Sequence, residues 1–146
     1  MLILGLKNTN DQILVVNDFI NFGTIYRKYC KKNSLGVKTF AYNNTNVALQ
    51  QEGIYHITAT ITFTAPVAGD VVFQLTNNGV AIDGATATET VTTATTEINT
   101  TTIDYFVLAD ATCVLGQPSV NANVGIQLTG VDATVTNVVL NIEKVV

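Results

Sequence analysis

The clearest pattern of the chain lies between residues 53 and 65, where an apolar residue occupies every second position. A period of two is typical of a β-strand, because successive side chains point to opposite faces of a sheet. We therefore predict one long strand with a buried face and a face lined mainly by threonine. The buried face would carry Tyr55, Ile57, Ala59, Ile61 and Phe63.

The same alternation returns in several later segments. Between two of them stands Asn77-Asn78-Gly79, and Asn-Gly predicts a type I′ hairpin turn, because both central residues of that turn need positive φ. In the last segment, Thr136 is predicted to share the buried face with Val138. Many short strands separated by turn signals indicate an antiparallel sandwich or barrel. The segments are 71–76, 80–82, 103–107, 120–129 and 136–142.

Two segments have a less certain pattern. Residues 85–102 are low in complexity, but their threonine and valine content and the absence of proline favour solvent-facing strands over disorder. Residues 17–33 carry aromatic residues at helical spacing, with Asn17 or Asp18 as a possible N-cap. Gly23 and the β-branched and aromatic content oppose a helix, so a strand is favoured there and a helix is the alternative.

Two parts of the chain are distinguished by pattern. Residues 1–22 are interpreted as an N-terminal strand or an anchoring arm, since Leu2, Leu4 and Leu6 alternate. Residues 23–146 are expected to form the main domain. No basic residue precedes the apolar N-terminus and no small-residue cleavage site follows it, so a signal peptide is not expected.

Composition and charge limit the kinds of partner that the protein could bind. Apolar residues make up 47% of the chain and charged residues only 12%, which favours a protein whose surface is partly covered by a partner. No apolar run approaches the roughly 20 residues of a membrane-spanning helix, so no membrane partner is expected. Five of the seven basic residues lie between positions 27 and 38, whereas the net charge is −4, so nucleic acid is not expected either.

Short motifs in the central region resemble those of C1q/TNF-type jelly rolls. Gly53-Ile54-Tyr55 resembles the G-x-Y motif that opens a central strand of that family, and residues 75–79 resemble its later L-x-x-N-G turn. Residues 23–30, 78–87 and 136–145 are similar to the bacteriophage versions of this domain, which serve as head-fibre or capsid-decoration proteins.

The resemblance implies an antiparallel jelly-roll β-sandwich that forms a homotrimer and acts by binding, without an active site. It implies a virion structural protein made in the bacterial cytoplasm and placed on the virion surface, with phage capsid or fibre proteins as partners. The alternative is a carbohydrate- or receptor-binding jelly roll, similar to a lectin, that binds a host surface glycan. Binding loops would then lie near residues 65–70 and 109–120.

Candidate chemistry is sparse, and we expect no enzyme, no cofactor and no metal. His56 is the only histidine, and it is predicted to be an exposed or interface side chain, because the pattern places no orienting carboxylate beside it. Cys30 and Cys113 are interpreted as structural or free thiols, with a mutual disulfide as the alternative. Single carboxylates near turns are interpreted as aspartates that stabilise those turns by hydrogen bonds to the backbone. A calcium site is the alternative, since some C1q-like trimers bind calcium. The carboxylates are Asp70, Asp83, Asp104, Asp110 and Asp132.

Two groups of residues are candidates for assembly. Some aromatic side chains could meet at a threefold axis, with core filling as the alternative. Exposed basic residues could dock on an acidic capsid or fibre surface, with a solvated strand or loop as the alternative. The trimer-interface candidates are Tyr55, Phe63, Phe73 and Tyr105, and the docking candidates are Arg27, Lys28, Lys31 and Lys32.

Overall fold

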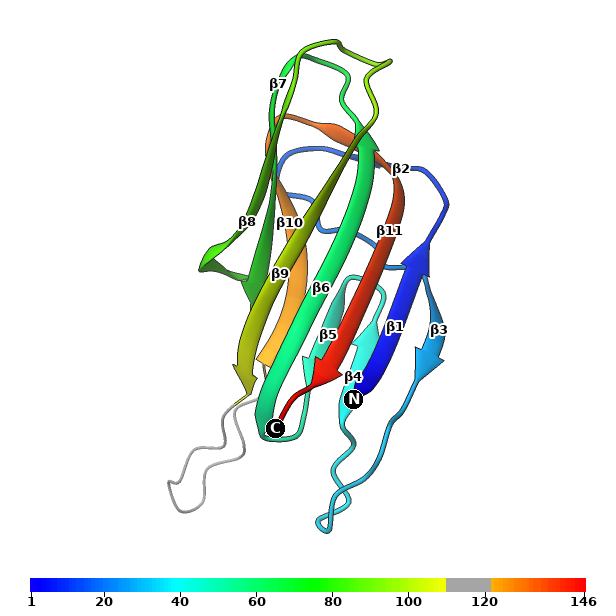
Figure 1. Cartoon of the computed structure of the whole chain (residues 1–146), viewed down its shortest axis with the longest axis vertical. Helices are drawn as coiled ribbons and strands as arrows, with labels where there is room; N and C mark the ends of the chain where they lie inside the picture. The colour runs from blue at the N-terminus through cyan, green and yellow to red at the C-terminus, as the bar shows by residue number, and fades with distance from the viewer. Residues whose placement is uncertain (110–121) are drawn as a thin grey trace.

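Two antiparallel sheets face one another and bury their apolar side chains between them (Figure 1). The computed structural model describes residues 1–109 and 122–146, and within these ranges all regular secondary structure is β-strand. The described part of the chain therefore contains no helix that could cross a membrane. The all-β antiparallel sandwich predicted from the alternation is confirmed.

Sheet A has the strand order β3-β1-β11-β6-β9, and β2 also pairs with β11. The first and last strands lie side by side, with Leu6 opposite Leu140. Residues 2–8 are a strand of the sheet, and its Leu4 and Leu6 are fully buried in the core. The strands are β1 (Leu2–Asn8), β2 (Gln12–Leu14), β3 (Thr24–Lys28), β6 (Gly53–Thr64), β9 (Asn99–Ala109) and β11 (Ala133–Lys144).

Sheet B has the order β4-β5-β10-β7-β8. The turn between β7 and β8 contains Asn78 and Gly79 with φ of 53° and 78°, so both central residues have the positive φ of the predicted hairpin turn. The threonine-rich segment 85–102 supplies the end of β8 and the start of β9, which confirms the strand prediction for residues 85–91 and 99–102, whereas residues 92–98 form the connection between the two strands. The strands are β4 (Phe40–Asn43), β5 (Asn46–Leu49), β7 (Gly69–Asn77), β8 (Val80–Val91) and β10 (Ala122–Gly130).

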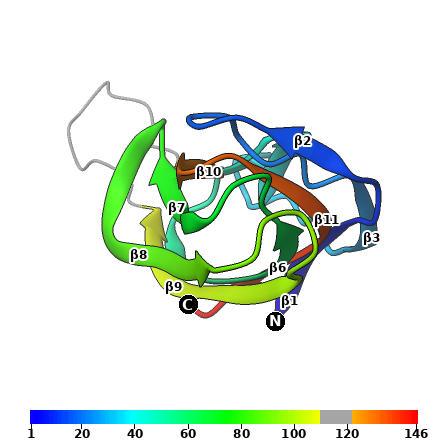
Figure 2. The same ribbon diagram turned by 90° about the horizontal axis from the view of Figure 1, so that it is seen from above.

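The core lies between the two sheets. Figure 2 shows the arrangement of their strands along the long axis of the molecule. All five predicted inward residues of β6 are fully buried, as the period of two requires. Phe63 of sheet A meets Phe73 of sheet B edge to face, with ring centroids 5.2 Å apart at 69°. This aromatic pair joins the two layers directly.

A β-bulge in β11 corrects the predicted phase of the last strand. The register against β6 shifts between Val135 and Asn137, and the buried residues on either side of the shift are Val135 and Val138. Thr136 is half-buried and donates a hydrogen bond to the Thr62 carbonyl, at 3.3 Å. One extra residue in the strand reverses the alternation, so the prediction that Thr136 shares the buried face is wrong.

The ambiguous segment 17–33 contains a strand and no helix. β3 covers residues 24–28, and Phe19 forms an isolated bridge with Gln127 of β10. Phe22 is buried, whereas Tyr26 and Tyr29 are exposed, so the aromatic residues do not share one face as a helix would require. The favoured strand interpretation is confirmed for β3, which forms one edge of sheet A.

Candidate assembly surface

The outer face of sheet A carries large apolar side chains exposed to solvent. Ile54 of β6 lies opposite Leu108 of β9, and the next outward pair along the strands is His56 and Phe106. Phe106 and Leu108 are 57% and 59% exposed, and Ile54 is 38% exposed. We call Ile54, Phe106 and Leu108 the apolar patch. Grouped exposed apolar side chains are typical of a surface that contacts another protein.

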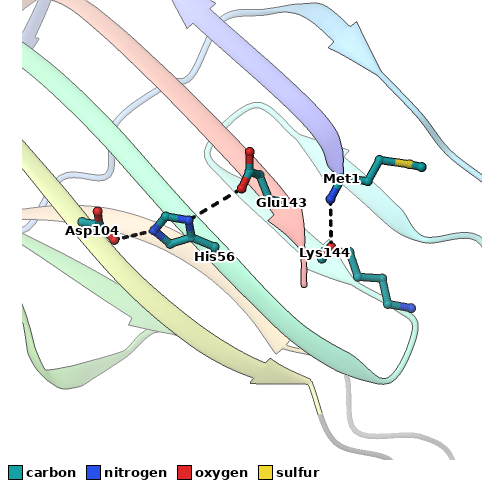
Figure 3. A network of polar contacts seen from close by, with 5 residues as sticks. All are labelled: Met1, His56, Asp104, Glu143 and Lys144. Atoms are coloured by element: carbon teal, nitrogen blue, oxygen red, sulfur yellow. Dashed lines mark hydrogen bonds and ion pairs between the residues drawn. The ribbon is translucent and has the colours of Figure 1, made fainter. Parts of the chain in front are cut away.

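His56 lies beside the apolar patch and is held by three neighbours. Its ring stacks on Phe106, with centroids 4.6 Å apart and planes at 17°. Its Nε2 lies 2.5 Å from an Asp104 carboxylate oxygen on β9, and its Nδ1 lies 3.8 Å from Glu143 on β11 (Figure 3). The stacked pair is a rigid, flat surface with two carboxylates at its border.

The expectation that no carboxylate lies beside His56 is wrong. Strand pairing places Glu143 directly opposite His56 and Asp104 opposite Thr58, within reach of the same ring. Local alternation could indicate that Asp104 and Phe106 point outward, but it carries no information on which strands are neighbours. The two carboxylates approach opposite nitrogens of the ring, so their arrangement orients the imidazole and does not converge on one metal position.

The structure places three of the four trimer-interface candidates in the core. Tyr55, Phe63 and Phe73 have no exposed surface, so their side chains cannot contact a second subunit, and the core-filling alternative describes them. Tyr105 is half-buried and donates a hydrogen bond to the Asp83 carbonyl, at 3.2 Å. Phe106, which follows Tyr105 and points to the other face, is the aromatic residue that sequence reasoning missed.

The buried hydroxyl of Tyr55 is expected to make the stability of the fold depend on pH in the alkaline range. It donates a hydrogen bond to the Gln51 carbonyl at 2.7 Å, and burial raises its pKa to about 12. Because the unfolded chain ionises this group near pH 10, the free energy of unfolding falls as pH rises from about 10 to 12. We expect the stability advantage of the wild type over Tyr55→Phe to shrink by roughly 2 kcal/mol between pH 8.5 and 11.5. Urea unfolding of both proteins at each pH measures it, and a constant difference would contradict it.

Two of the predicted turn carboxylates join neighbouring segments of the chain. Asp132 accepts a hydrogen bond from the Val16 amide at 2.9 Å, and Asp70 accepts one from the Thr90 hydroxyl at 2.8 Å. In residues 1–109 and 122–146, no group of three or more histidine, cysteine or acidic side chains is placed to hold a metal ion. Asp110 lies outside the described residues.

The cysteine pairing and one predicted binding loop are only partly covered by the structure. Cys30 is exposed, whereas Cys113 and residues 110–120 of the predicted loop lie outside the described residues. The loop at residues 65–70 is exposed from Pro66 to Ala68.

A separate polar cleft of about 340 Å³ is lined by Lys7, Asn8, Asn21, Asn44 and their neighbours, and no aromatic side chain is among its described lining residues. Aromatic platforms are typical of glycan sites, so this cleft does not favour the lectin-like alternative.

Comparisons with known proteins identify the fold. No family model matches the sequence, and no curated protein matches it either. The structure is similar to that of Eiger TNF from S. frugiperda, with 9% identity and a TM-score of 0.60 over 99% of this chain and 93% of that one. It is also similar to murine APRIL at pH 8.5, with 8% identity and a TM-score of 0.59 over 96% of this chain and 98% of that one. The chain is therefore a jelly-roll β-sandwich of the C1q/TNF-like type, as the sequence resemblance implied.

Proposed function

We propose that this protein is a non-enzymatic virion structural protein that assembles into a homotrimer and decorates a phage head or forms part of a head fibre. The observation that carries the assembly is the apolar patch beside the stacked His56–Phe106 pair. The resemblance of residues 23–30, 78–87 and 136–145 to phage decoration domains supports the virion role. The basic residues at positions 27–32 would face the particle.

Burial of the apolar patch between subunits would stabilise the assembly. Burial of a large apolar side chain contributes about 1.5–3 kcal/mol, and three such side chains per subunit would be removed from water. Association also costs several kcal/mol in lost rotational and translational freedom, so the patch must be largely buried for a stable complex. Asp104 and Glu143 lie at its border, where carboxylates could keep contact with water.

Two measurements test this proposal. Size-exclusion chromatography with light scattering should give a mass three times that of the 15.6-kDa chain. A monomer at tens of micromolar would overturn the trimer. Electron microscopy of phage particles assembled with and without the protein should then show trimeric density on the head only when the protein is present, and particles that do not differ would overturn the virion role.

A further inference from the structure

A small pocket opens at the end of the sandwich where both ends of the chain lie (Figure 1). Its volume is about 290 Å³, which is enough for one large apolar side chain and a few waters. Ile3 and Tyr29 are among its lining residues, and so are two lysines, Lys31 and Lys144. An apolar hollow beside two cations suits a ligand that is both apolar and anionic.

The backbone of Lys31 is fastened to the rest of the sandwich. The buried Thr39 hydroxyl accepts from the Lys31 amide at 3.2 Å and donates to the Lys31 carbonyl at 2.9 Å. Gln51 donates to the same carbonyl at 2.7 Å. The amide of Tyr29 donates to the Ile3 carbonyl at 2.7 Å, so this segment is tied to β1 as well. The wall of the pocket is therefore preformed.

Lys144 is also held in place. Its ammonium donates to the Gln51 side chain at 3.3 Å and lies 5.8 Å from the centre of the Tyr55 ring. Gln51 thus connects the two lysine-bearing segments, since its amide nitrogen binds the Lys31 carbonyl and its oxygen binds Lys144. Preformed polar groups lose little conformational freedom on binding.

The chain segment that carries Lys31 is strongly basic. Five basic residues stand between positions 27 and 52, and Glu52 is the only acidic residue of that stretch. Lys28, Lys32 and Lys38 are all exposed. Within the described parts of the chain, every contact of 4 Å or less between a basic and an acidic side chain involves His56, so these lysines have no carboxylate partner there. Their charge is left to attract an external anion.

We propose that this pocket binds an acidic peptide segment of another protein, which inserts one apolar side chain between Tyr29 and Ile3. Carboxylates on either side of that residue contact Lys31 and Lys144, and the outer lysines attract the segment before it docks. The source of the peptide, a protein of the particle, rests on the proposed function. The assignment of the pocket itself does not. The pocket and the apolar patch share no residue, so peptide binding and trimer formation can be tested separately.

The test uses the full chain and two fluorescein-labelled peptides, acetyl-Asp-Glu-Phe-Asp-Glu-amide and the same peptide with alanine at the centre. Fluorescence anisotropy at low salt should give a Kd at least fivefold lower for the phenylalanine peptide. The double variant Lys31→Glu, Lys144→Glu should raise that Kd at least tenfold. Lys7→Glu is the matched control, because Lys7 is exposed at the far end of β1 and should change the Kd less than twofold.

A third variant separates the apolar contact from the charge. Tyr29→Ala keeps every lysine, and it should remove the preference for phenylalanine over alanine while leaving weak binding of both peptides. Equal Kd values for the two peptides with the wild type, or equal effects of Lys7→Glu and of the double variant, would show nonspecific charge attraction and overturn the site. Binding to phosphatidylglycerol vesicles without binding to either peptide would also overturn it, in favour of a lipid surface.

The same samples separate this inference from the proposed function. Light scattering on each variant reports the mass independently of peptide binding. A monomer that binds the phenylalanine peptide would contradict the trimer and leave the pocket assignment intact. A trimer that binds neither peptide would contradict the pocket assignment alone.

Discussion

Replacement of Phe106 by glutamate is expected to convert the proposed trimer into a folded monomer. The side chain is 57% exposed in the single chain and lies within the apolar patch, so its loss removes apolar surface from the contact and not from the core. The new carboxylate would stand near Asp104 and Glu143, in three copies around one axis. Burial of unpaired like charges costs several kcal/mol, so we expect the dissociation constant of the assembly to rise at least 100-fold.

The matched control is Val80→Glu. Val80 is 70% exposed and begins β8 of sheet B, so the same chemical change occurs away from the patch. This variant should remain trimeric at concentrations at which Phe106→Glu is monomeric, by light scattering. Both should keep the circular dichroism spectrum of a β-sheet protein. If Phe106→Glu keeps the wild-type mass, the outer face of sheet A is not the contact.

The strands were predictable because alternation is a local property of the chain. Each residue of β6 from Tyr55 to Phe63 obeys the inward and outward pattern, and the positive φ values of Asn78 and Gly79 follow from the same short sequence. The phase of β11 was predictable from Val138 to Ile142, where every second residue is buried as expected, but not at Thr136, where the bulge interrupts the alternation. The extra residue at Thr136 is accommodated by pairing with β6, a strand about 70 positions earlier in the sequence.

The candidate assembly surface was only partly predictable. The same alternation that turns Tyr55, Phe63 and Phe73 into the core turns Phe106 outward, so the signal for Phe106 was present in the sequence. Aromatic residues at inward positions fill the core, so they are poor candidates for a contact between subunits. Aromatic residues at outward positions are the better candidates. The carboxylates beside His56 depend on the order of strands in sheet A, which no local pattern contains.

The basic residues at positions 27–38 were also predictable only in part. Their composition was visible in the sequence, but the pocket beside them depends on Thr39 and Gln51, which hold the Lys31 segment against the end of the sandwich. It also depends on Lys144, which lies more than 100 residues further along the chain and meets Gln51 only because β11 pairs with β6. Long-range pairing thus turns a local charge run into a shaped site.

Truncation of Phe63 to alanine is expected to give the largest loss of stability of any single change considered above. The ring is fully buried on β6 and meets Phe73 across the two sheets. Removal of a buried phenylalanine side chain costs about 3–5 kcal/mol, because transfer free energy is lost and the cavity only partly collapses. The free energy of unfolding of a typical domain is only about 5–15 kcal/mol, so the folded state of this variant should be barely stable.

The loss is best measured by urea unfolding in the Phe106→Glu background, where assembly does not add to the stability of the single chain. Phe63→Leu should cost less than Phe63→Ala, because it keeps most of the apolar volume, and it remains measurable if the alanine variant does not fold. Ile98→Ala is the exposed control, since Ile98 is 71% exposed in the loop before β9, and should change stability by less than about 0.5 kcal/mol. A cost for Phe63→Ala as small as that of Ile98→Ala would mean that Phe63 does not join the two sheets, and the layered core would have to be revised.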